Sequence, residues 1–292
     1  MNKILVGKNQ KFNTLQAAID SLEGKEKVTI LLEPGIYHEK VELRRNNVVI
    51  EGTGDSPEDT VISFDDYAFD LMPGTEEKRG TFRSYTMLVY ANDVTLENLT
   101  IENASGDSDT HGQAIALYAE GDNISVINCR LLGHQDTLFT GPLPPKEVQP
   151  GGFIGPTQFA ERIIGTQMYE GCYICGDVDF IFGSARAYFD DCVIESLRRD
   201  FDNSEAIQGY CTAASTYEGE DLGYLFRKCS FVSKDCPEES VYLGRPWRDY
   251  AKTEFVDCTF GMHIKKEMFC EWSGRIAQGT TYYNTSGCCW EK

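Results

Sequence analysis

The stretch Val126-Ile-Asn-Cys129-Arg-Leu131 recurs along the chain, and this recurrence decides the predicted fold. Each copy has apolar residues three positions before and two positions after the cysteine column. The other copies are Leu96–Ile101, which has Leu in that column, Tyr169–Ile174, Phe189–Ile194, Phe226–Phe231 and Phe255–Phe260. In all six copies the residue just before the cysteine column is Asn, Gly, Asp or Lys. The stretch is therefore one unit of an internal repeat.

The repeat indicates stacked coils of short parallel strands. Each copy has short apolar strands on both sides of a polar corner, and Asn, Asp and Gly supply corner conformations. Successive cysteines of the repeat are 43, 20, 37 and 29 residues apart. This irregular spacing suits a solenoid whose coils carry loops of variable length. We therefore predict an all-β fold, a right-handed parallel β-helix, with the handedness taken from the crossover preference of parallel strands.

One helix is predicted before the coils begin. Asn13 or Thr14 can cap a segment that ends at Gly24 and has its apolar residues on one face: Leu15, Ala18, Ile19 and Leu22. This capping helix would cover the open end of the solenoid and protect a sheet edge. The tail from Gly279 is expected to cover the other end.

The composition fits a single domain over residues 1–292. Hydrophobic residues make up 41% of the chain, and 46 acidic against 27 basic side chains give a formal net charge of −19. That excess argues against nucleic acid or an anionic membrane as a partner, and no apolar stretch is long enough for a membrane span. With no signal peptide visible, we expect a cytoplasmic protein, or a secreted one if the chain is a trimmed mature form. We expect a monomer.

The eleven cysteines are interpreted as core residues. An odd number excludes a fully paired intramolecular framework, and a ladder of coils uses cysteine as a small hydrophobe. Cys172 and Cys175 have the spacing of half a zinc site, but no second half follows and the four histidines are scattered. No metal is therefore expected. The Pro- and Gly-rich segment at about 141–166 lacks repeat character and is interpreted as a long inserted loop.

Two aspartates occupy equivalent places in neighbouring coils. Asp136 and Asp179 each lie seven residues after a cysteine of the repeat, so stacking in register places them on adjacent strands, roughly 4.7 to 4.9 Å apart. Two nearby carboxylates repel, and one pKa should rise, which makes the pair a catalytic candidate. Alternatively, one of them is a corner residue that bonds its own backbone. The pair alone does not decide between these interpretations.

Neighbouring polar residues favour the catalytic interpretation. Gln135 directly precedes Asp136, and Gln113 stands in the preceding coil. Amide donors beside a carboxylate pair can stabilise a developing oxyanion. Arg245 supplies a guanidinium two residues before Trp247. Its alternative role is a surface ion pair, which is common in so acidic a chain.

Five segments resemble, in the same order, the signature motifs of the pectin methylesterase (pectinesterase) family: Gly35-Ile-Tyr-His-Glu39, Gln113-Ala-Ile-Ala-Leu117, Gly133-His-Gln-Asp-Thr-Leu138, Val178-Asp-Phe-Ile-Phe-Gly183 and Leu243-Gly-Arg-Pro-Trp247. The resemblance extends from about Phe12 to Trp272 and is specific, because five multi-residue motifs occur in order. It implies a parallel β-helix and a carboxylic ester hydrolase that removes C6 methyl esters from homogalacturonan (pectin) or methylated oligogalacturonides. Methanol would be released, without a metal or an organic cofactor.

The resemblance also implies a role for each matching residue. Asp179 would attack the ester carbonyl, and Asp136 would protonate the departing methanol and then activate water. Gln113 and Gln135 would form the oxyanion hole. Arg245 would keep Asp179 ionised, which implies a low pKa for Asp179 and a high one for Asp136.

Substrate contacts are expected from Trp247 and Phe139. Trp247 would offer an apolar face to a sugar ring, and Phe139 stands where many members of the family have Tyr. The family is also mostly exported, whereas this chain shows no leader. The insertion at about 141–166 lengthens the spacing between the two aspartates and is expected to overhang the cleft.

Two other functions fit parts of this pattern. A galacturonan glycosidase could use two carboxylates about 5 to 5.5 Å apart in a retaining mechanism, although the glutamines and Arg245 suit acyl chemistry better. A carbohydrate-binding solenoid without catalysis is the non-enzymatic alternative. It would be expected to lack an aspartate or the arginine, and none of the five proposed site residues is missing.

Overall fold

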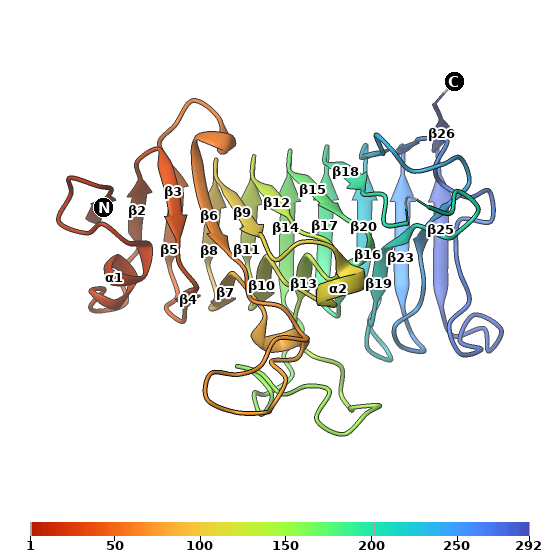
Figure 1. The fold of residues 1–292 in the computed structure, drawn as a ribbon, viewed down its shortest axis with the longest axis horizontal. Coiled ribbons are helices and arrows are strands. Elements are labelled where there is room, and N and C mark those ends of the chain that lie inside the picture. Colours follow the sequence, from red (N-terminus) through yellow and green to blue (C-terminus); the bar gives the residue numbers. More distant parts are fainter. Residues whose placement is uncertain (1, 201, 292) are drawn as a thin grey trace.

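Three long sheets of parallel strands form the molecule, for which a computed structural model describes residues 2–200 and 202–291. The strands stand side by side along the long axis, with the N-terminal coils at one end and the C-terminal coils at the other (Figure 1). Every paired strand runs parallel to its neighbour, and each sheet takes one strand from successive coils. The predicted parallel β-helix is confirmed.

The sheets differ in length and are named here by their number of strands. The ten-stranded sheet contains, in spatial order, β1 (Asn2–Val6), β2 (Val28–Leu32), β5 (Val48–Gly52), β8 (Val94–Glu97), β11 (Ile124–Ile127), β14 (Thr166–Glu170), β17 (Arg186–Asp190), β20 (Tyr224–Arg227), β23 (Lys252–Val256) and β25 (Tyr282–Ser286). The nine-stranded sheet contains β26 (Cys289–Trp290), β24 (Thr259–Phe260), β21 (Ser230–Val232), β18 (Val193–Ser196), β15 (Tyr173–Gly176), β12 (Arg130–Leu132), β9 (Thr100–Asn103), β6 (Thr60–Phe64) and β3 (Gly35–His38).

The seven-stranded sheet is the one that positions the candidate site. It contains β22 (Val241–Gly244), β19 (Gly209–Ala214), β16 (Val178–Gly183), β13 (Leu138–Thr140), β10 (Leu117–Glu120), β7 (Met87–Tyr90) and β4 (Val41–Leu43). Helical segments are short: α1 (Leu15–Asp20), α2 (Ser108–His111) and two 3₁₀ turns, Pro57–Asp59 and Thr81–Arg83. In the described part of the chain, no helix has the length and apolar character needed to cross a membrane.

A left-handed residue turns the chain between the ten-stranded and nine-stranded sheets. The residue before the cysteine column has φ between 48° and 60° in all six copies of the repeat: Asn98, Asn128, Gly171, Asp191, Lys228 and Asp257. Asn, Asp and Gly adopt this conformation at low cost, which explains why they dominate the column. The repeat in the sequence is thus a repeat of corner geometry.

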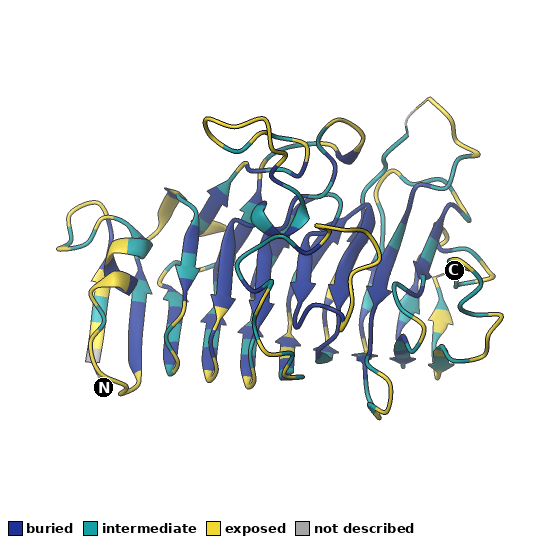
Figure 2. Ribbon diagram, turned by 90° about the horizontal axis from the view of Figure 1, so that it is seen from below, coloured by how far each residue is buried: buried dark blue, intermediate teal, exposed yellow. Residues whose placement is uncertain are grey.

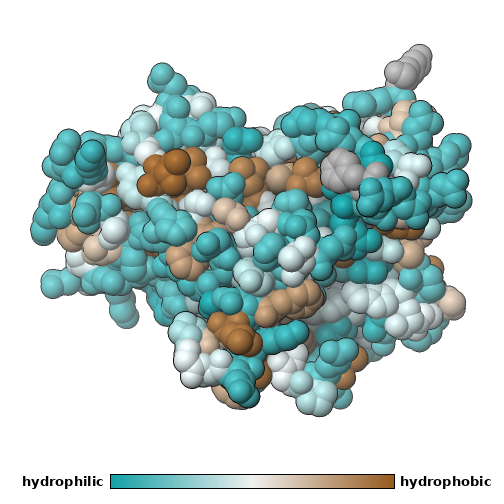
Figure 3. Space-filling model, viewed as in Figure 1, coloured by the Kyte–Doolittle hydropathy of each residue, from teal (hydrophilic) through white to brown (hydrophobic). Residues whose placement is uncertain are grey.

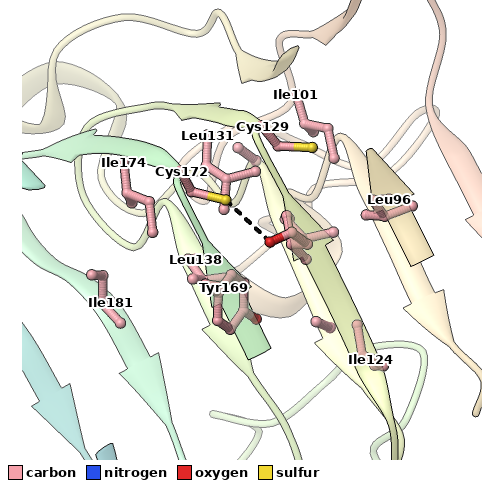
Figure 4. Close-up of a cluster of buried hydrophobic side chains, with 14 of the residues drawn as sticks. Leu96, Ile101, Ile124, Cys129, Leu131, Leu138, Tyr169, Cys172, Ile174 and Ile181 are labelled. Atoms are coloured by element: carbon pink, nitrogen blue, oxygen red, sulfur yellow. Dashed lines mark hydrogen bonds between the residues drawn. The ribbon is translucent and has the colours of Figure 1, made fainter. Parts of the chain in front are cut away.

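The cysteine column forms a ladder inside the solenoid, as the sequence predicts. Cys129, Cys172, Cys192, Cys229 and Cys258 are at most 1% exposed, and all eleven cysteines are free thiols. From Cys172 onward, each of these thiols donates to a backbone carbonyl of the preceding coil, as Cys172 does to Val126 O at 3.3 Å (Figure 4). The column therefore joins neighbouring coils besides filling the core.

An aromatic ladder fills the column three residues before the cysteines. The rings of Tyr169, Phe189, Phe226 and Phe255 stack face to face, with successive centroids 4.7, 4.4 and 5.1 Å apart. All four residues are fully buried. Because each ring contacts the coils before and after it, the ladder holds the C-terminal half of the solenoid in register.

The predicted helix is present as α1 at the N-terminal end, although it ends at Asp20, before Gly24. The Thr14 side chain caps it by accepting a hydrogen bond from Ala17 N, and its buried residues are Leu15, Ala18 and Ile19. The Glu39 carboxylate accepts from the first two backbone N–H groups, Leu15 N and Gln16 N. This anion at a helix N-terminus attaches α1 to the first coils.

The C-terminal tail differs from the prediction, because it forms another coil. β25 and β26 extend two of the sheets, and Gly287 between them has φ 67°. Cys288 follows in the cysteine column, and its thiol donates to Phe255 O at 3.4 Å. This is a seventh copy of the repeat, with polar Thr285 in place of the usual apolar residue at the column three before the cysteine.

Two long connections project from the same side of the solenoid, at the lower edge of Figure 1. Residues 65–86 join β6 to β7, and residues 141–165 join β13 to β14. Most of their length is exposed or half-buried in Figure 2, in contrast to the dark strands. Within the second connection, Phe153 and Thr157 are buried. These two residues anchor the predicted insertion against the body of the protein.

Removing one ring of the aromatic ladder should weaken the whole solenoid. Phe226 is fully buried between Phe189 and Phe255, so Phe226→Ala should lower the free energy of unfolding by about 3 to 5 kcal/mol. Urea unfolding followed by circular dichroism measures this. Phe159→Ala is the matched control, because Phe159 is 94% exposed and its loss should cost less than about 0.5 kcal/mol. Equal effects of the two substitutions would contradict the ladder's role.

Candidate active site

A cavity of about 480 Å³ opens above the seven-stranded sheet, beside the two projecting connections. Six of the seven residues selected from the sequence line it: Gln113, Gln135, Asp136, Asp179, Arg245 and Trp247. The 3₁₀ turn Thr81–Arg83 contributes Thr81 and Phe82, and the inserted loop contributes Val148, Gln149, Gly152 and Phe153. In the space-filling view, these projecting connections carry a few apolar side chains among polar ones (Figure 3). The loop therefore forms one wall of the cavity.

Asp136 and Asp179 stand in register, as the spacing predicts. Leu138 pairs with Ile181 on β13 and β16, two residues after each aspartate, and Asp136 N donates to Val178 O at 3.1 Å. Asp136 has φ 66° and Asp179 has φ 51°. Aspartate adopts this left-handed conformation at low cost, as in the corners of the repeat. Both side chains are buried, at 7% and 6% exposure.

Arg245 holds Asp179 through two parallel hydrogen bonds. Its Nε donates to Oδ1 at 2.8 Å, and an Nη donates to Oδ2 at 2.7 Å. The guanidinium also lies between two aromatic rings, 3.9 Å from the centroid of Tyr210 and 4.1 Å from that of Trp272. Bidentate pairing and ring stacking together fix the orientation of the arginine. The alternative of a surface ion pair does not fit this enclosed arrangement.

Burial raises the pKa of both carboxyls, but by different amounts. The pKa of Asp136 lies well above its usual range because the group is desolvated and the Asp179 charge repels a second negative charge. Burial also raises the pKa of Asp179, but hydrogen bonding and charge attraction from Arg245 oppose that shift. The expectation of a low pKa for Asp179 is therefore wrong, because desolvation outweighs the ion pair. The expected order of the two pKa values is retained, with that of Asp179 below that of Asp136, so Asp179 loses its proton first.

The two glutamines present free amide groups to the cavity. Ala114 N donates to Gln135 O at 3.0 Å, which places Gln113 and Gln135 in adjacent coils, and both line the cavity. Gln113 follows α2 and the left-handed Gly112, φ 73°. No hydrogen bond within residues 2–200 and 202–291 occupies either side-chain amide. Both amides are thus free to donate to an oxygen atom in the cavity.

The two expected substrate-binding residues have different positions. Trp247 lines the cavity, with its ring 5.6 Å from that of Phe182 and 6.4 Å from that of Phe153. Phe139, in contrast to the prediction, is fully buried among aromatic residues and does not line the cavity. Its ring packs 5.1 Å from that of Phe82. Phe139 therefore supports the cavity indirectly, through its contact with Phe82, which lines it.

Sequence reasoning missed Asp177, a third carboxylate, which directly precedes β16. It is 1% exposed and accepts hydrogen bonds from Ser108 Oγ at 2.8 Å and from Val178 N at 2.6 Å. His134 Nδ1 lies 3.2 Å from the same carboxylate. The Asp177 charge contributes to the raised pKa of both Asp136 and Asp179. Its place two residues before Asp179, in a segment whose backbone bonds to His134, is the signal that could have revealed it.

Tyr210 and Trp272 were also missed. Neither belongs to a multi-residue motif, and both are far from Arg245 in the sequence. Tyr210 could have been found from the sheet register, because it pairs with Val178 and Tyr242 on the neighbouring strands. Trp272 lies outside the strands, and no pattern in the sequence predicts its position.

Across residues 2–200 and 202–291, no group of three His, Cys, Asp or Glu side chains could hold a metal ion.

Comparison with known proteins assigns the chain to a family. The sequence model described as Pectinesterase matches residues 3–142 and 162–288. The chain belongs to the pectinesterase family. The unmatched residues 143–161 lie within the Pro- and Gly-rich loop at about 141–166, which the sequence predicts to be an insertion.

Individual relatives agree with this assignment. Probable pectinesterase/pectinesterase inhibitor 64 of Arabidopsis thaliana is 32% identical over 296 residues, which cover 95% of this chain and 43% of that protein. The chain thus spans less than half of that relative. Pectinesterase 31 of Arabidopsis thaliana is 31% identical over 245 residues, covering 82% of this chain and 67% of that protein.

Solved structures show the same fold. Pectin methylesterase PemA from Erwinia chrysanthemi superposes with a TM-score of 0.75 at 26% identity, covering 97% of this chain and 90% of that chain. Pectin methylesterase from Yersinia enterocolitica gives 0.77 at 27% identity, covering 96% and 90%. The shared architecture therefore extends over nearly the whole molecule.

The buried Asp136 carboxyl should make stability depend on pH. Because its pKa is raised on folding, it contributes stability that is present below its unfolded pKa of about 4 and lost as the pH rises through the folded pKa. Asp136→Asn keeps the shape and removes the charge. It should raise the free energy of unfolding by at least about 1 kcal/mol at about pH 8 and change it little at about pH 4.

Urea unfolding at the two pH values measures this difference. Asp257→Asn, which substitutes an exposed corner aspartate of the same left-handed conformation, controls for the general effect of removing one negative charge. A gain of the same size at both pH values, or a loss at the higher one, would contradict a raised pKa for Asp136.

Proposed function

We propose that this protein hydrolyses the C6 methyl esters of galacturonate units in pectin or methylated oligogalacturonides and releases methanol. The observation that carries the proposal is the Arg245–Asp179 pair beside Asp136. One carboxylate is held by a bidentate guanidinium, and its neighbour has a more strongly raised pKa. Family membership supports the reaction class, and a pectin methylesterase of 26% identity and TM-score 0.75 has been solved with a hexasaccharide.

The first half of the reaction transfers the acyl group to Asp179. An oxygen of the ionised Asp179 attacks the ester carbonyl, and the carbonyl oxygen becomes an oxyanion. The free amides of Gln113 and Gln135 donate to that oxyanion. As the tetrahedral intermediate collapses, the bond to the methoxy oxygen breaks and Asp136 gives its proton to the leaving methanol. An acyl anhydride on Asp179 and an ionised Asp136 remain.

The second half returns the enzyme to its starting state. Asp136, now a carboxylate, removes a proton from water as the water oxygen attacks the galacturonyl carbon of the anhydride. The second tetrahedral intermediate expels Asp179 as a carboxylate, and Arg245 again pairs with it. The products are methanol and a galacturonic acid carboxyl, which releases its proton to solvent and becomes a carboxylate. Each cycle therefore begins with Asp179 ionised, because Arg245 pairs with it, and with Asp136 protonated, because it is buried.

The arrangement favours ester hydrolysis over the other two functions. A glycosidase nucleophile needs no paired amide donors facing an acyl oxygen, and here two glutamine amides are unoccupied beside the carboxylates. A binding solenoid gains nothing from two neighbouring buried carboxyls, because burying such groups is costly and raises the pKa of both. Trp247 at the cavity wall is the apolar face expected for a sugar ring.

Substitution of the proposed nucleophile should abolish methanol release. On highly methylated pectin, Asp179→Ala should reduce the rate by at least about 10⁴-fold, since the covalent route is lost. Methanol and product chain length are measured together, by enzymatic assay and size-exclusion chromatography. Asp190→Ala, at an ion pair with Arg227 on the ten-stranded sheet, is the matched control and should retain activity.

Unchanged chain length with Asp179-dependent methanol release is the expected result. Chain shortening without methanol would contradict the proposal in favour of a glycosidase. Methanol release that survives Asp179→Ala would remove Asp179 from the role of nucleophile.

A further inference from the structure

The two projecting connections reach the seven-stranded sheet from opposite edges. Residues 65–86 lead from the nine-stranded sheet to the start of β7, whereas residues 141–165 leave the end of β13 for the ten-stranded sheet. Both connections project together from one side of the molecule (Figure 1). Their meeting parts are called the arch here: the turn Thr81–Arg83 and residues 151–157.

The two connections are in direct contact within the arch. The Phe82 ring lies 5.9 Å from that of Phe153. Only glycine fits at position 155, because a Cβ on Gly155 would stand 2.6 Å from the Cβ of Phe82 and 3.0 Å from its backbone oxygen. The backbone of the insertion therefore packs on the backbone of the turn, and a sugar chain cannot pass between them at this point.

Hydrogen bonds fix the insertion in this position. Thr157 is 1% exposed, and its hydroxyl donates to Glu120 Oε2 at 2.7 Å and lies 2.6 Å from the Tyr118 hydroxyl. The Glu147 carboxylate accepts from two backbone N–H groups of the arch. The Arg162 guanidinium donates to three carbonyls of the same loop. These contacts make the arch a fixed wall.

The arch covers the outer face of the sheet over β7, β10 and β13. Leu88, Tyr118 and Phe139 are register partners on these strands. All three are fully buried in a cluster outside the solenoid core. At the same level on the next two strands, Phe182 and Ala213 line the candidate site's cavity. The cover therefore ends, and the cavity begins, between β13 and β16.

The arch separates two cavities. Phe82 and Phe153 line the cavity that holds the carboxylates. The residues that follow them, Arg83 and Ile154, line a second cavity of about 440 Å³ on the other side. From the arch, the first cavity extends past β16, β19 and β22 to Trp272. It is thus a groove along the sheet with one end closed by the arch.

The catalytic groups stand at the closed end of this groove. Gln113 and Asp136 precede β10 and β13, which are strands beneath the arch. Both residues line the cavity together with Phe82 of the arch. A galacturonate chain that places an ester at Asp179 can extend toward Trp272, whereas the arch blocks its extension in the opposite direction.

We propose that the arch makes this protein an end-acting esterase, which removes the methyl ester from the terminal unit of a methylated oligogalacturonide or from the unit next to it. This inference rests on the proposed function for its reaction and narrows the substrate class. An interior unit of a long polymer needs room for the chain on both sides of the carboxylates. The closed groove gives that room on one side only.

The position of the first ester removed tests the inference on the wild type. Fully methylated hexagalacturonate, labelled at its reducing end with a heavy oxygen isotope, is digested briefly, and tandem mass spectrometry locates the free carboxyl. It should lie on the terminal unit or its neighbour, at one end of the chain. The value of kcat/KM per ester should be at least about tenfold higher for methylated trigalacturonate than for long, highly methylated pectin.

First cleavages spread over the interior units, or equal kcat/KM values for the two substrates, would overturn the inference. Its failure differs from that of the proposed function, which would appear as no methanol from any of these substrates.

A shortened loop tests whether the arch causes the preference. Replacing residues 146–161 with Gly-Ser-Gly removes the insertion's half of the arch and leaves both catalytic aspartates in place. The ratio of kcat/KM for pectin to that for the trimer should rise about tenfold. Phe159→Ala, a 94% exposed position on the same loop, is the control and should keep the wild-type ratio.

A shortened variant that folds, as judged by circular dichroism, and keeps the wild-type ratio would contradict a role for the arch. If the shortened variant does not fold, the cleavage positions on the wild type still decide for or against an end-acting enzyme.

Discussion

The in-register stacking of the coils is the constraint on which the rest of the structure depends. A left-handed corner residue turns the chain at the same place in seven successive coils, from Asn98 to Gly287, and the cysteine and aromatic ladders prevent one coil from slipping against the next. Side chains at equivalent positions of two coils must then lie side by side. The proximity of Asp136 and Asp179 follows from this register, although 43 residues separate them in the sequence.

Register alone would give the two carboxyls equivalent environments. Their neighbouring side chains make their proton affinities different. Arg245 reaches Asp179 from β22 with both of its hydrogen bonds, whereas Asp136 receives no cation of its own. Asp177 adds a further negative charge nearby, and its carboxylate accepts hydrogen bonds from Ser108 and Val178. The same low-dielectric environment thus separates the proton affinities of the two groups, which is the condition for one to act as nucleophile and the other as acid.

The sequence predicts those parts that depend on repetition. Six copies of the corner were recognisable because Asn, Asp and Gly tolerate its backbone conformation, and the register of the aspartates followed directly. The seventh copy was missed because Thr285 breaks the apolar pattern. The position of Phe139 was predicted wrongly because the direction of its side chain depends on packing against Phe82. The pKa of Asp179 was predicted wrongly because the cost of burying a carboxyl cannot be read from a motif. Trp272 and Phe153 come from irregular segments, whose paths are set by tertiary contacts.

The proposed reaction requires Asp179 to be ionised while Asp136 beside it is protonated. Carbon-13 NMR of the protein labelled at its aspartate carboxyls, with the two resonances assigned from Asp136→Asn and Asp179→Asn, follows both titrations directly. Asp179 should titrate first as the pH rises, and Asp136 should remain protonated to a higher pH. Titration of Asp136 below Asp179, or of both groups near the value of about 4 for an exposed aspartate, would contradict it.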